Sequence, residues 1–292
     1  MQRVGLFIVL GLATPSYADP VVAPLCELAP CVPSPVTIRT LTSGEQVGKI
    51  TCKGGEKLGV DSARRTVFCT TAVAVDIDGF VVAADAYTVF HPNGRIYQTH
   101  VREPFAASLA DRTLVVCGAG LVVLYDDGRL RYCTLAGTRA GTPRPRLGHG
   151  IEFRSDGRVA MLTLDEPHRE AGLALPAGAS VQWDERGALV GGSSPTRTLA
   201  GALVIAGEFT LYGGARLHTV ELAAAANIQG HELPARARLT FHSDGTLETA
   251  SYTDREGSAD GEAWTDRRTL TYDRRGTITS SDVERYWWGR TR

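Results

Sequence analysis

Apolar and polar residues alternate in short runs along this chain, and sequences rich in Asp, Asn and Gly separate the runs. The clearest case spans residues 121–135, LVVLYDDGRLRYCTL, where an Asp-Gly pair lies between two alternating segments. Alternation with a period of two is typical of a half-buried strand, and Asp-Gly favours a tight hairpin turn. The pattern therefore predicts a β-hairpin, and versions of it recur along most of the chain.

The turn glycine marks a repeat with a period of about 30 residues, which is the range expected of a repeat array. In two further units an arginine or an alanine takes the place of that glycine. The eight equivalent positions are Arg64, Gly94, Gly128, Gly157, Gly187, Ala215, Gly245 and Gly276. Each unit is expected to hold three short strands, with a second turn upstream of the tip at Cys117, Pro176 or Pro234. The predicted fold is all-β, a tandem β-hairpin repeat array or β-solenoid of about eight 30-residue units.

Two apolar columns flank the tip of each predicted hairpin. The residues four before the marked position are Val60, Phe90, Leu124, Phe153, Trp183, Leu211, Phe241 and Tyr272. The residues two after it are Thr66, Ile96, Leu130, Val159, Leu189, Leu217, Leu247 and Ile278. In a three-residue hairpin loop with glycine in the left-handed conformation, the two columns are cross-strand partners. The sequence thus predicts one such pair behind every tip.

The cysteines fall into pairs when they are placed on the repeat. Cys52 and Cys69 occupy nearly the same places in one unit as Cys117 and Cys133 occupy in another. This equivalence predicts the disulfides Cys52–Cys69 and Cys117–Cys133. A third bond, Cys26–Cys31, would close a small loop ahead of the repeats. A zinc site is the competing interpretation, but the spacings are not the CxxC type and export favours disulfides.

The first 18 residues have the features of a secretory signal peptide. Arg3 is followed by an unbroken apolar run, and Ser16 and Ala18 are small residues at the expected cleavage site. We expect cleavage after Ala18 and a periplasmic or extracellular location. A proline-rich spacer is expected at 19–45, the repeats at 46–285 and an aromatic tail at 286–292. No later apolar run has the length that a membrane span needs, and a net charge of −1 gives no general attraction to nucleic acid.

The tip acids are the main candidates for chemistry, either as paired catalytic carboxylates or as a row of calcium sites. They are Asp126, Asp127, Asp156, Asp244 and Asp273. The alternative is turn chemistry, because Asp and Asn hydrogen-bond their own backbone in turns, and we favour it. No catalytic motif appears, and no cofactor or metal is expected. His91 and His242 share one column and are expected to face solvent.

A ligand surface is the remaining possibility. Its candidate residues are Trp183, Trp287, Trp288, Arg95, Arg129 and Arg158. The three arginines follow turn glycines in successive units, where stacking would align them as a ladder of cations. Such a ladder can serve solubility and edge protection, or it can bind an anionic glycan.

The xFxxDGxLxxxxL columns and the upstream glycine resemble those of exported bacterial hairpin-repeat proteins. They are more distantly similar to MORN-type repeats, which also build a sheet from short hairpins around glycine. The resemblance covers about residues 46–283. The chain departs from MORN repeats in its longer period and in lacking a Tyr-Glu-Gly-Trp core. The resemblance implies a repeat fold and carries no catalytic residue onto this chain.

The sequence favours a non-enzymatic secreted or periplasmic protein that acts as a binding or structural module of the cell envelope. Two alternatives stay open. One is a carbohydrate-binding module that uses its tryptophans, and the other is an envelope hydrolase that uses acids on one face of the array. An envelope protein or a glycan is the expected partner.

Overall fold

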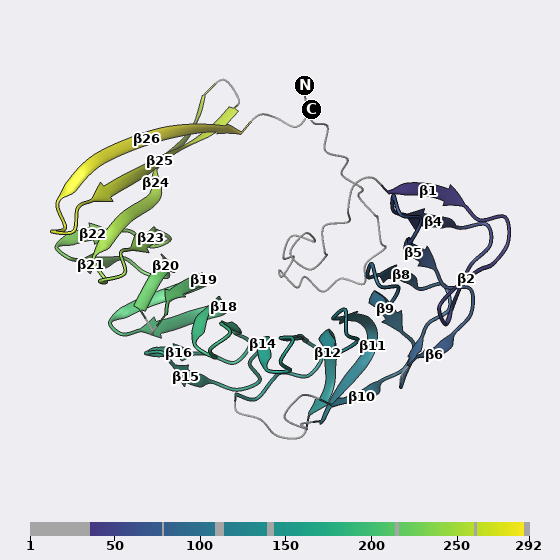
Figure 1. The fold of residues 1–292 in the computed structure, drawn as a ribbon. Coiled ribbons are helices and arrows are strands. Elements are labelled where there is room, and N and C mark those ends of the chain that lie inside the picture. The colour runs from purple at the N-terminus through teal and green to yellow at the C-terminus, as the bar shows by residue number, and fades with distance from the viewer. Residues whose placement is uncertain are drawn as a thin grey trace.

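The computed structural model describes residues 36–77, 79–108, 114–138, 143–213, 216–259 and 262–288. The ordered elements of this part of the chain are all strands, and most of them belong to one 22-stranded antiparallel sheet. The sheet curves into an open arc, with β1 at one end and β26 at the other (Figure 1). The all-β repeat array predicted from the sequence is therefore present, and its sheet does not close into a barrel.

A continuous series of antiparallel pairings forms the main layer of the arc. Each strand of this series pairs with the next one named. In order, the strands are β1 (Thr37–Thr40), β4 (Lys57–Val60), β5 (Thr66–Thr70), β8 (Tyr87–Phe90), β9 (Ile96–Val101), β11 (Leu114–Leu124), β12 (Leu130–Thr138), β13 (Gly150–Phe153), β14 (Val159–Thr163), β17 (Ser180–Trp183), β18 (Leu189–Ala200), β19 (Leu203–Tyr212), β20 (Arg216–Leu222), β23 (Arg238–Phe241), β24 (Leu247–Ala259), β25 (Glu262–Tyr272) and β26 (Ile278–Trp288).

Short side hairpins form a second layer. Their strands are β2 (Glu45–Val47), β3 (Ile50–Cys52), β6 (Val75–Ile77), β7 (Phe80–Val82), β15 (His168–Glu170), β16 (Leu173–Leu175), β21 (Ala226–Ile228) and β22 (His231–Leu233), and the single strand β10 (Phe105–Ser108) pairs with β11. Phe80, Leu175 and Leu233 from this layer are buried in the same apolar cluster as Phe153 and Phe241 of the main sheet. The core therefore lies between the two layers.

Glycines upstream of the tips explain why two units, β15–β18 and β21–β24, hold four strands instead of the predicted three. Ala171 and Gly172 connect β15 to β16 with φ angles of 51° and 76°. Gln229 and Gly230 do the same between β21 and β22, with φ angles of 52° and 88°. Two successive residues with positive φ are the type I′ turn that suits a two-residue hairpin loop. These glycines thus end one strand and begin another.

The predicted cross-strand pair is present behind all eight tips. The pairs are Val60↔Thr66, Phe90↔Ile96, Leu124↔Leu130, Phe153↔Val159, Trp183↔Leu189, Leu211↔Leu217, Phe241↔Leu247 and Tyr272↔Ile278. At a representative tip, Gly128 has a φ of 90° and its N–H donates to the Tyr125 carbonyl at 2.9 Å. The tip glycine in the left-handed conformation is the feature that the three-residue loop requires. Ala215 lies outside the described residues.

Both disulfides predicted from the repeat are formed. Cys52 is bonded to Cys69 and Cys117 to Cys133, with a Cα–Cα distance of 5.7 Å in each case. All four side chains are fully buried. The expectation of a turn at Cys117 is wrong, because this residue lies inside β11, at a register shift in its pairing with β12. The proposed Cys26–Cys31 bond lies outside the described residues, as does the signal peptide.

The ends of the sheet differ from the boundaries expected from the sequence. β1 pairs with β4 although it falls within the predicted spacer, so the sheet begins at Thr37. At the other end, Tyr286 and Trp287 are part of β26, so the predicted tail begins inside a strand. No helix long and apolar enough to span a membrane occurs in the described ranges.

We expect removal of the Cys117–Cys133 bond by the double change C117A/C133A to lower the free energy of unfolding by about 3 kcal/mol, because the bond closes a loop of 16 residues. Urea unfolding monitored by circular dichroism measures this change. Mass spectrometry after non-reducing digestion provides the control. A peptide that joins Cys52 to Cys117 would contradict the assigned pairing.

Candidate functional site

Four of the five tip acids predicted from the sequence, Asp127, Asp156, Asp244 and Asp273, are engaged in their own turns. The described contact of Asp126 is through its backbone carbonyl, which accepts a hydrogen bond from Asn93 Nδ2 at 2.8 Å. In four units the residue before the marked position accepts a hydrogen bond from the backbone N–H two residues later, at 2.9–3.0 Å. These acceptors are Asn93, Asp127, Asp156 and Asp244. In three other units the acceptor is an aspartate three residues before the marked position. It accepts two backbone N–H groups at 2.8–2.9 Å. These aspartates are Asp61, Asp184 and Asp273. The turn interpretation is therefore confirmed for these acids.

The environment of three tip acids, Asp127, Asp244 and Asp273, lowers their pKa and favours the ionised form. The pKa of Asp127 lies below its usual value because the side chain and then the backbone N–H of Arg129 donate hydrogen bonds to its carboxylate. The hydroxyl and the N–H of Thr246 lower the pKa of Asp244 in the same way. For Asp273, the N–H of Thr277 is the main cause of the lower pKa. A general acid needs the opposite shift, since it must hold its proton near neutral pH.

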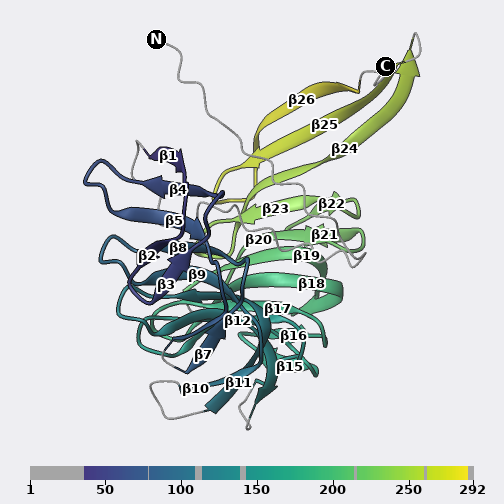
Figure 2. The same ribbon diagram turned by 90° about the vertical axis from the view of Figure 1, so that its right-hand side faces the viewer.

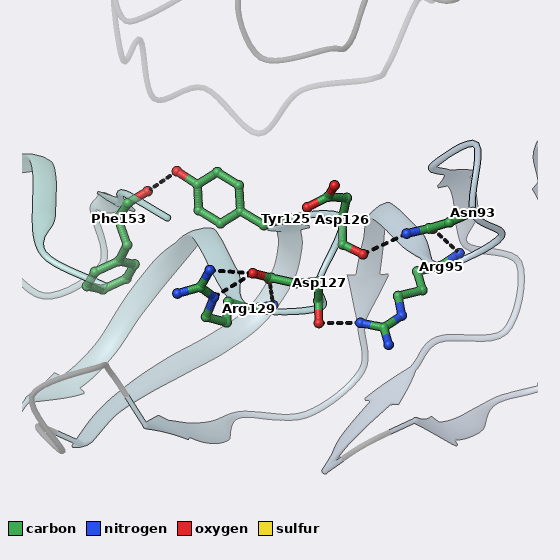
Figure 3. Close-up of polar contacts among 7 residues, drawn as sticks. All are labelled: Asn93, Arg95, Tyr125, Asp126, Asp127, Arg129 and Phe153. Carbon is green, nitrogen blue, oxygen red and sulfur yellow. Dashed lines mark hydrogen bonds and ion pairs between the residues drawn. The ribbon is translucent and has the colours of Figure 1, made fainter. Parts of the chain in front are cut away.

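The ladder arginines contact the tip acids directly (Figure 3). Arg129 forms an ion pair with Asp127 of its own turn, with its Nε 2.6 Å from Oδ2. Arg95 reaches the next unit, where its guanidinium donates to the Asp127 carbonyl oxygen. Arg158 lies beside Asp156, with Nε 3.8 Å from Oδ2. The three arginines are exposed, but two of them are held in place by hydrogen bonds within and between units.

A second set of polar side chains joins neighbouring units, and sequence reasoning missed it. His91 Nε2 donates to the Leu124 carbonyl at 3.0 Å, and the Tyr125 hydroxyl donates to the Phe153 carbonyl at 2.7 Å (Figure 3 shows the second). Arg154 donates to the Trp183 carbonyl, and Tyr212 donates to that of Phe241 at 3.0 Å. All four donors occupy one column, directly after the large apolar residue, and each bonds the carbonyl of that apolar residue in the next unit. We call this set the relay column.

The residue type in this column accounts for all the links except at His242, which contacts Glu248 of its own unit instead. Tyr, His and Arg side chains are long enough to cross to the next unit and carry a donor. Aspartate occupies the same column at Asp61, Asp184 and Asp273, where it caps its own turn instead. The division of the column into long donors and aspartates is visible in the sequence. It is the signal that could have identified the links.

The expectation that His91 and His242 face solvent is wrong. Both side chains are half-buried. Besides its bond to the Leu124 carbonyl, the His91 ring meets that of Tyr97 edge-on, with centroids 5.1 Å apart. His242 Nδ1 lies 3.9 Å from a carboxylate oxygen of Glu248.

The candidate tryptophans do not converge on one surface. Trp183 is half-buried against the core, and its Nε1 donates to the Glu170 carboxylate at 3.0 Å. Trp287 lies at the far end of the arc in β26, with 51% of its surface exposed. The Trp288 backbone pairs with that of Ala263, and its side chain lies outside the described set. The ladder arginines belong to the second, third and fourth units, away from β26.

An aromatic and charged cluster is present at the C-terminal end of the sheet. Trp264 of β25 lies directly opposite Trp287 of β26, and the next pair on the same face is Asp266 with Arg285. Arg285 donates two hydrogen bonds to the Asp266 carboxylate, at 2.6 and 2.8 Å. Its guanidinium carbon also lies 4.0 Å from the centre of the Trp264 ring and 5.9 Å from that of Trp287. Gly257 allows this packing, since a Cβ there would come within 2.5 Å of the Trp264 ring.

Among the described residues, no group of three or more His, Cys, Asp or Glu side chains has a geometry that could hold a metal ion. No family model matches the sequence, and no curated protein matches it. Function must therefore be argued from the residues themselves.

We expect Tyr125→Phe to lower the free energy of unfolding by about 1 kcal/mol, because it removes the donor to the Phe153 carbonyl. Tyr252→Phe is the matched control, since Tyr252 is half-buried in β24 and lies outside the relay column. Urea unfolding of both variants measures the difference. An equal change in the two variants would show that the relay bond has no specific role.

Stability is expected to fall as the pH drops below about 4. The pKa values of Asp61, Asp127, Asp244, Asp266 and Asp273 are all lower in the folded chain than the usual 3.8. Over that window the unfolded chain binds more protons than the folded chain, so acid favours unfolding. Urea midpoints between pH 7 and pH 2.5 measure this dependence. A midpoint that stays constant through the window would contradict the assigned role of the tip acids.

Proposed function

We propose that this chain is an exported repeat protein and a non-enzymatic binding or structural module of the cell envelope. The observation that carries the proposal is that the tip acids and arginines are engaged within and between the units. Polar groups that a hydrolase would need for chemistry are here the groups that shape the turns. The lowered pKa values of these acids support the same role.

The two buried disulfides support export, because such bonds persist in oxidising compartments such as the periplasm. A signal peptide cleaved after Ala18 is part of this proposal. The proposal also places the chain with exported bacterial hairpin-repeat proteins. The support is the period of about 30 residues and the pair behind every tip.

Carbohydrate binding is a second candidate, and it is favoured by the cluster in β25 and β26. Trp264 and Trp287 share one face, and the Arg285 guanidinium lies beside both rings, 4.0 and 5.9 Å from their centres, oriented by Asp266. An exposed indole offers an apolar surface to the C–H face of a sugar, while a fixed guanidinium can donate to its hydroxyls. An anionic envelope polysaccharide has the chemistry that this cluster would recognise.

A binding assay separates these functions. We expect the mature chain, residues 19–292, to be retained by an envelope fraction without releasing soluble fragments from it. Peptidoglycan, an anionic polysaccharide and purified envelope proteins are tested separately, and the affinity for the retained component is measured by calorimetry. Soluble fragments that accumulate with time, and that are lost in Asp127→Asn, would show a hydrolase and contradict the proposal.

The same assay tests the glycan candidate with two matched variants. Trp287→Ala removes the exposed indole of the cluster, and Leu199→Ala removes an exposed apolar side chain elsewhere, at 54% exposure against 51%. Glycan binding predicts that only Trp287→Ala weakens retention on the polysaccharide, by about tenfold or more for a lost stacking contact. Equal retention of both variants would count against the glycan candidate and leave a protein partner as the preferred one.

A further inference from the structure

The last long hairpin of the array differs from a similar hairpin before it. β24 and β25 pair from Thr249↔Thr271 to Ala259↔Glu262, with a single register shift between Thr253 and Arg255. β18 and β19 form a comparable long hairpin, but its far end pairs with β16 of the side layer. Among the described residues, the far end of β24–β25 pairs only with β26, which continues the main sheet. We call residues 255–259, 262–267 and 284–288 the C-terminal arm, and it projects from the rest of the molecule (Figure 2).

The strand β26 is exposed on both of its faces. From Ile278 to Trp287 every residue is exposed except Ser280, which is half-buried. Val283 is 51% exposed, although it occupies the column seven residues after the tip, where Val101, Leu135, Leu164 and Leu222 are at most 3% exposed. Apolar residues that the repeat places in the core are thus left in contact with water at this end.

One edge of β26 has no strand partner among the described residues, since β26 pairs only with β25. The strand runs for 11 residues and contains neither proline nor lysine, two of the residues that commonly protect edges. The opposite end of the sheet is different. There β1 has only four residues and follows Pro33 and Pro35 in the sequence. A short edge beside prolines resists pairing, whereas the long edge of β26 invites it.

We propose that β26 pairs antiparallel with β26 of a second copy of this chain, forming a two-fold symmetric dimer through a continuous sheet. The array already grows by antiparallel pairing at every junction between units, and the free edge of β26 continues that series. Among the described strands, β26 is the one long unprotected edge of each chain. Two copies can therefore pair through this edge and form a closed dimer. The dimer follows from the fold and does not depend on the proposed ligand.

Charge excludes several registers of the dimer, and apolar contact distinguishes among the rest. A two-fold axis perpendicular to the sheet places residues of the same face opposite each other, so the axis must pass beside one residue of β26. An axis at Val283 would set Asp282 opposite Glu284, and an axis at Glu284 would set that carboxylate opposite itself. Like charges in directly opposite positions are destabilising.

An axis at Arg285 avoids both conflicts. It sets Val283 of one chain opposite Trp287 of the other, twice, and joins two exposed apolar residues. The two Arg285 side chains then face each other, but each is already paired with Asp266 of its own chain at 2.6 and 2.8 Å. This register uses residues 282–288 and is the one we propose.

Sedimentation equilibrium of the purified mature chain tests the dimer. The wild type is expected to be dimeric at micromolar concentrations. Val283→Lys is expected to weaken the dimer at least about tenfold, because it replaces both Val283–Trp287 contacts and adds two charges. Ile38→Lys on β1, where Ile38 is 52% exposed, is the matched control and should not change the association. Circular dichroism confirms that both variants are folded.

Cysteine cross-linking tests the register. The double variant V283C/W287C should form intermolecular disulfides on mild oxidation, because these positions are opposite each other across the axis. Each single variant should not, because its two copies are displaced along the strand. A monomeric wild type up to about 100 μM, above the usual affinity range of stable dimers, would overturn the proposal. So would a dimer that Val283→Lys and Ile38→Lys affect equally.

Discussion

The structure depends on the burial of the apolar pair behind each hairpin tip, which no unit can achieve alone. A hairpin of this size exposes one of its faces, and stacking against the next unit and the side hairpins covers it. Phe153 is completely buried in this way, and Phe90 and Phe241 are each 5% exposed. Burying one such side chain contributes about 1.5–3 kcal/mol, so the repeated pair is a major source of cohesion along the arc.

The hydrogen bonds of the tips follow from the same constraint. Stacking brings two groups of neighbouring units close together. One is the side chain that follows the large apolar residue in one unit, and the other is the carbonyl of the large apolar residue in the next unit. His91, Tyr125, Arg154 and Tyr212 use that proximity. The acids of the turns fix the loop, and the long donors join the loops. The polar side chains of the hairpin tips therefore mainly stabilise the turns and the contacts between units.

The sequence predicted the repeat, the tip pairs and both described disulfides because each of these recurs at equivalent positions. It did not predict the relay column, since one unit read alone does not show what its neighbour presents. The type I′ turns at Gly172 and Gly230 were not predicted, because apolar residues flank them on both sides. The bends that precede the side hairpins were also not predicted from the sequence. Pro104 and Pro167 lie at two of the bends, but the Ala223–Ala225 bend has only alanines.

Native-state hydrogen exchange measures the cooperativity of the array most directly. If stacking holds the units together, amides on the two sides of a junction, such as those of β11–β12 and β13–β14, should share a similar opening free energy. The protection should rise toward the middle of the arc and fall toward the short edge strand β1. Hairpins that exchange independently, each with its own low opening free energy, would contradict this account.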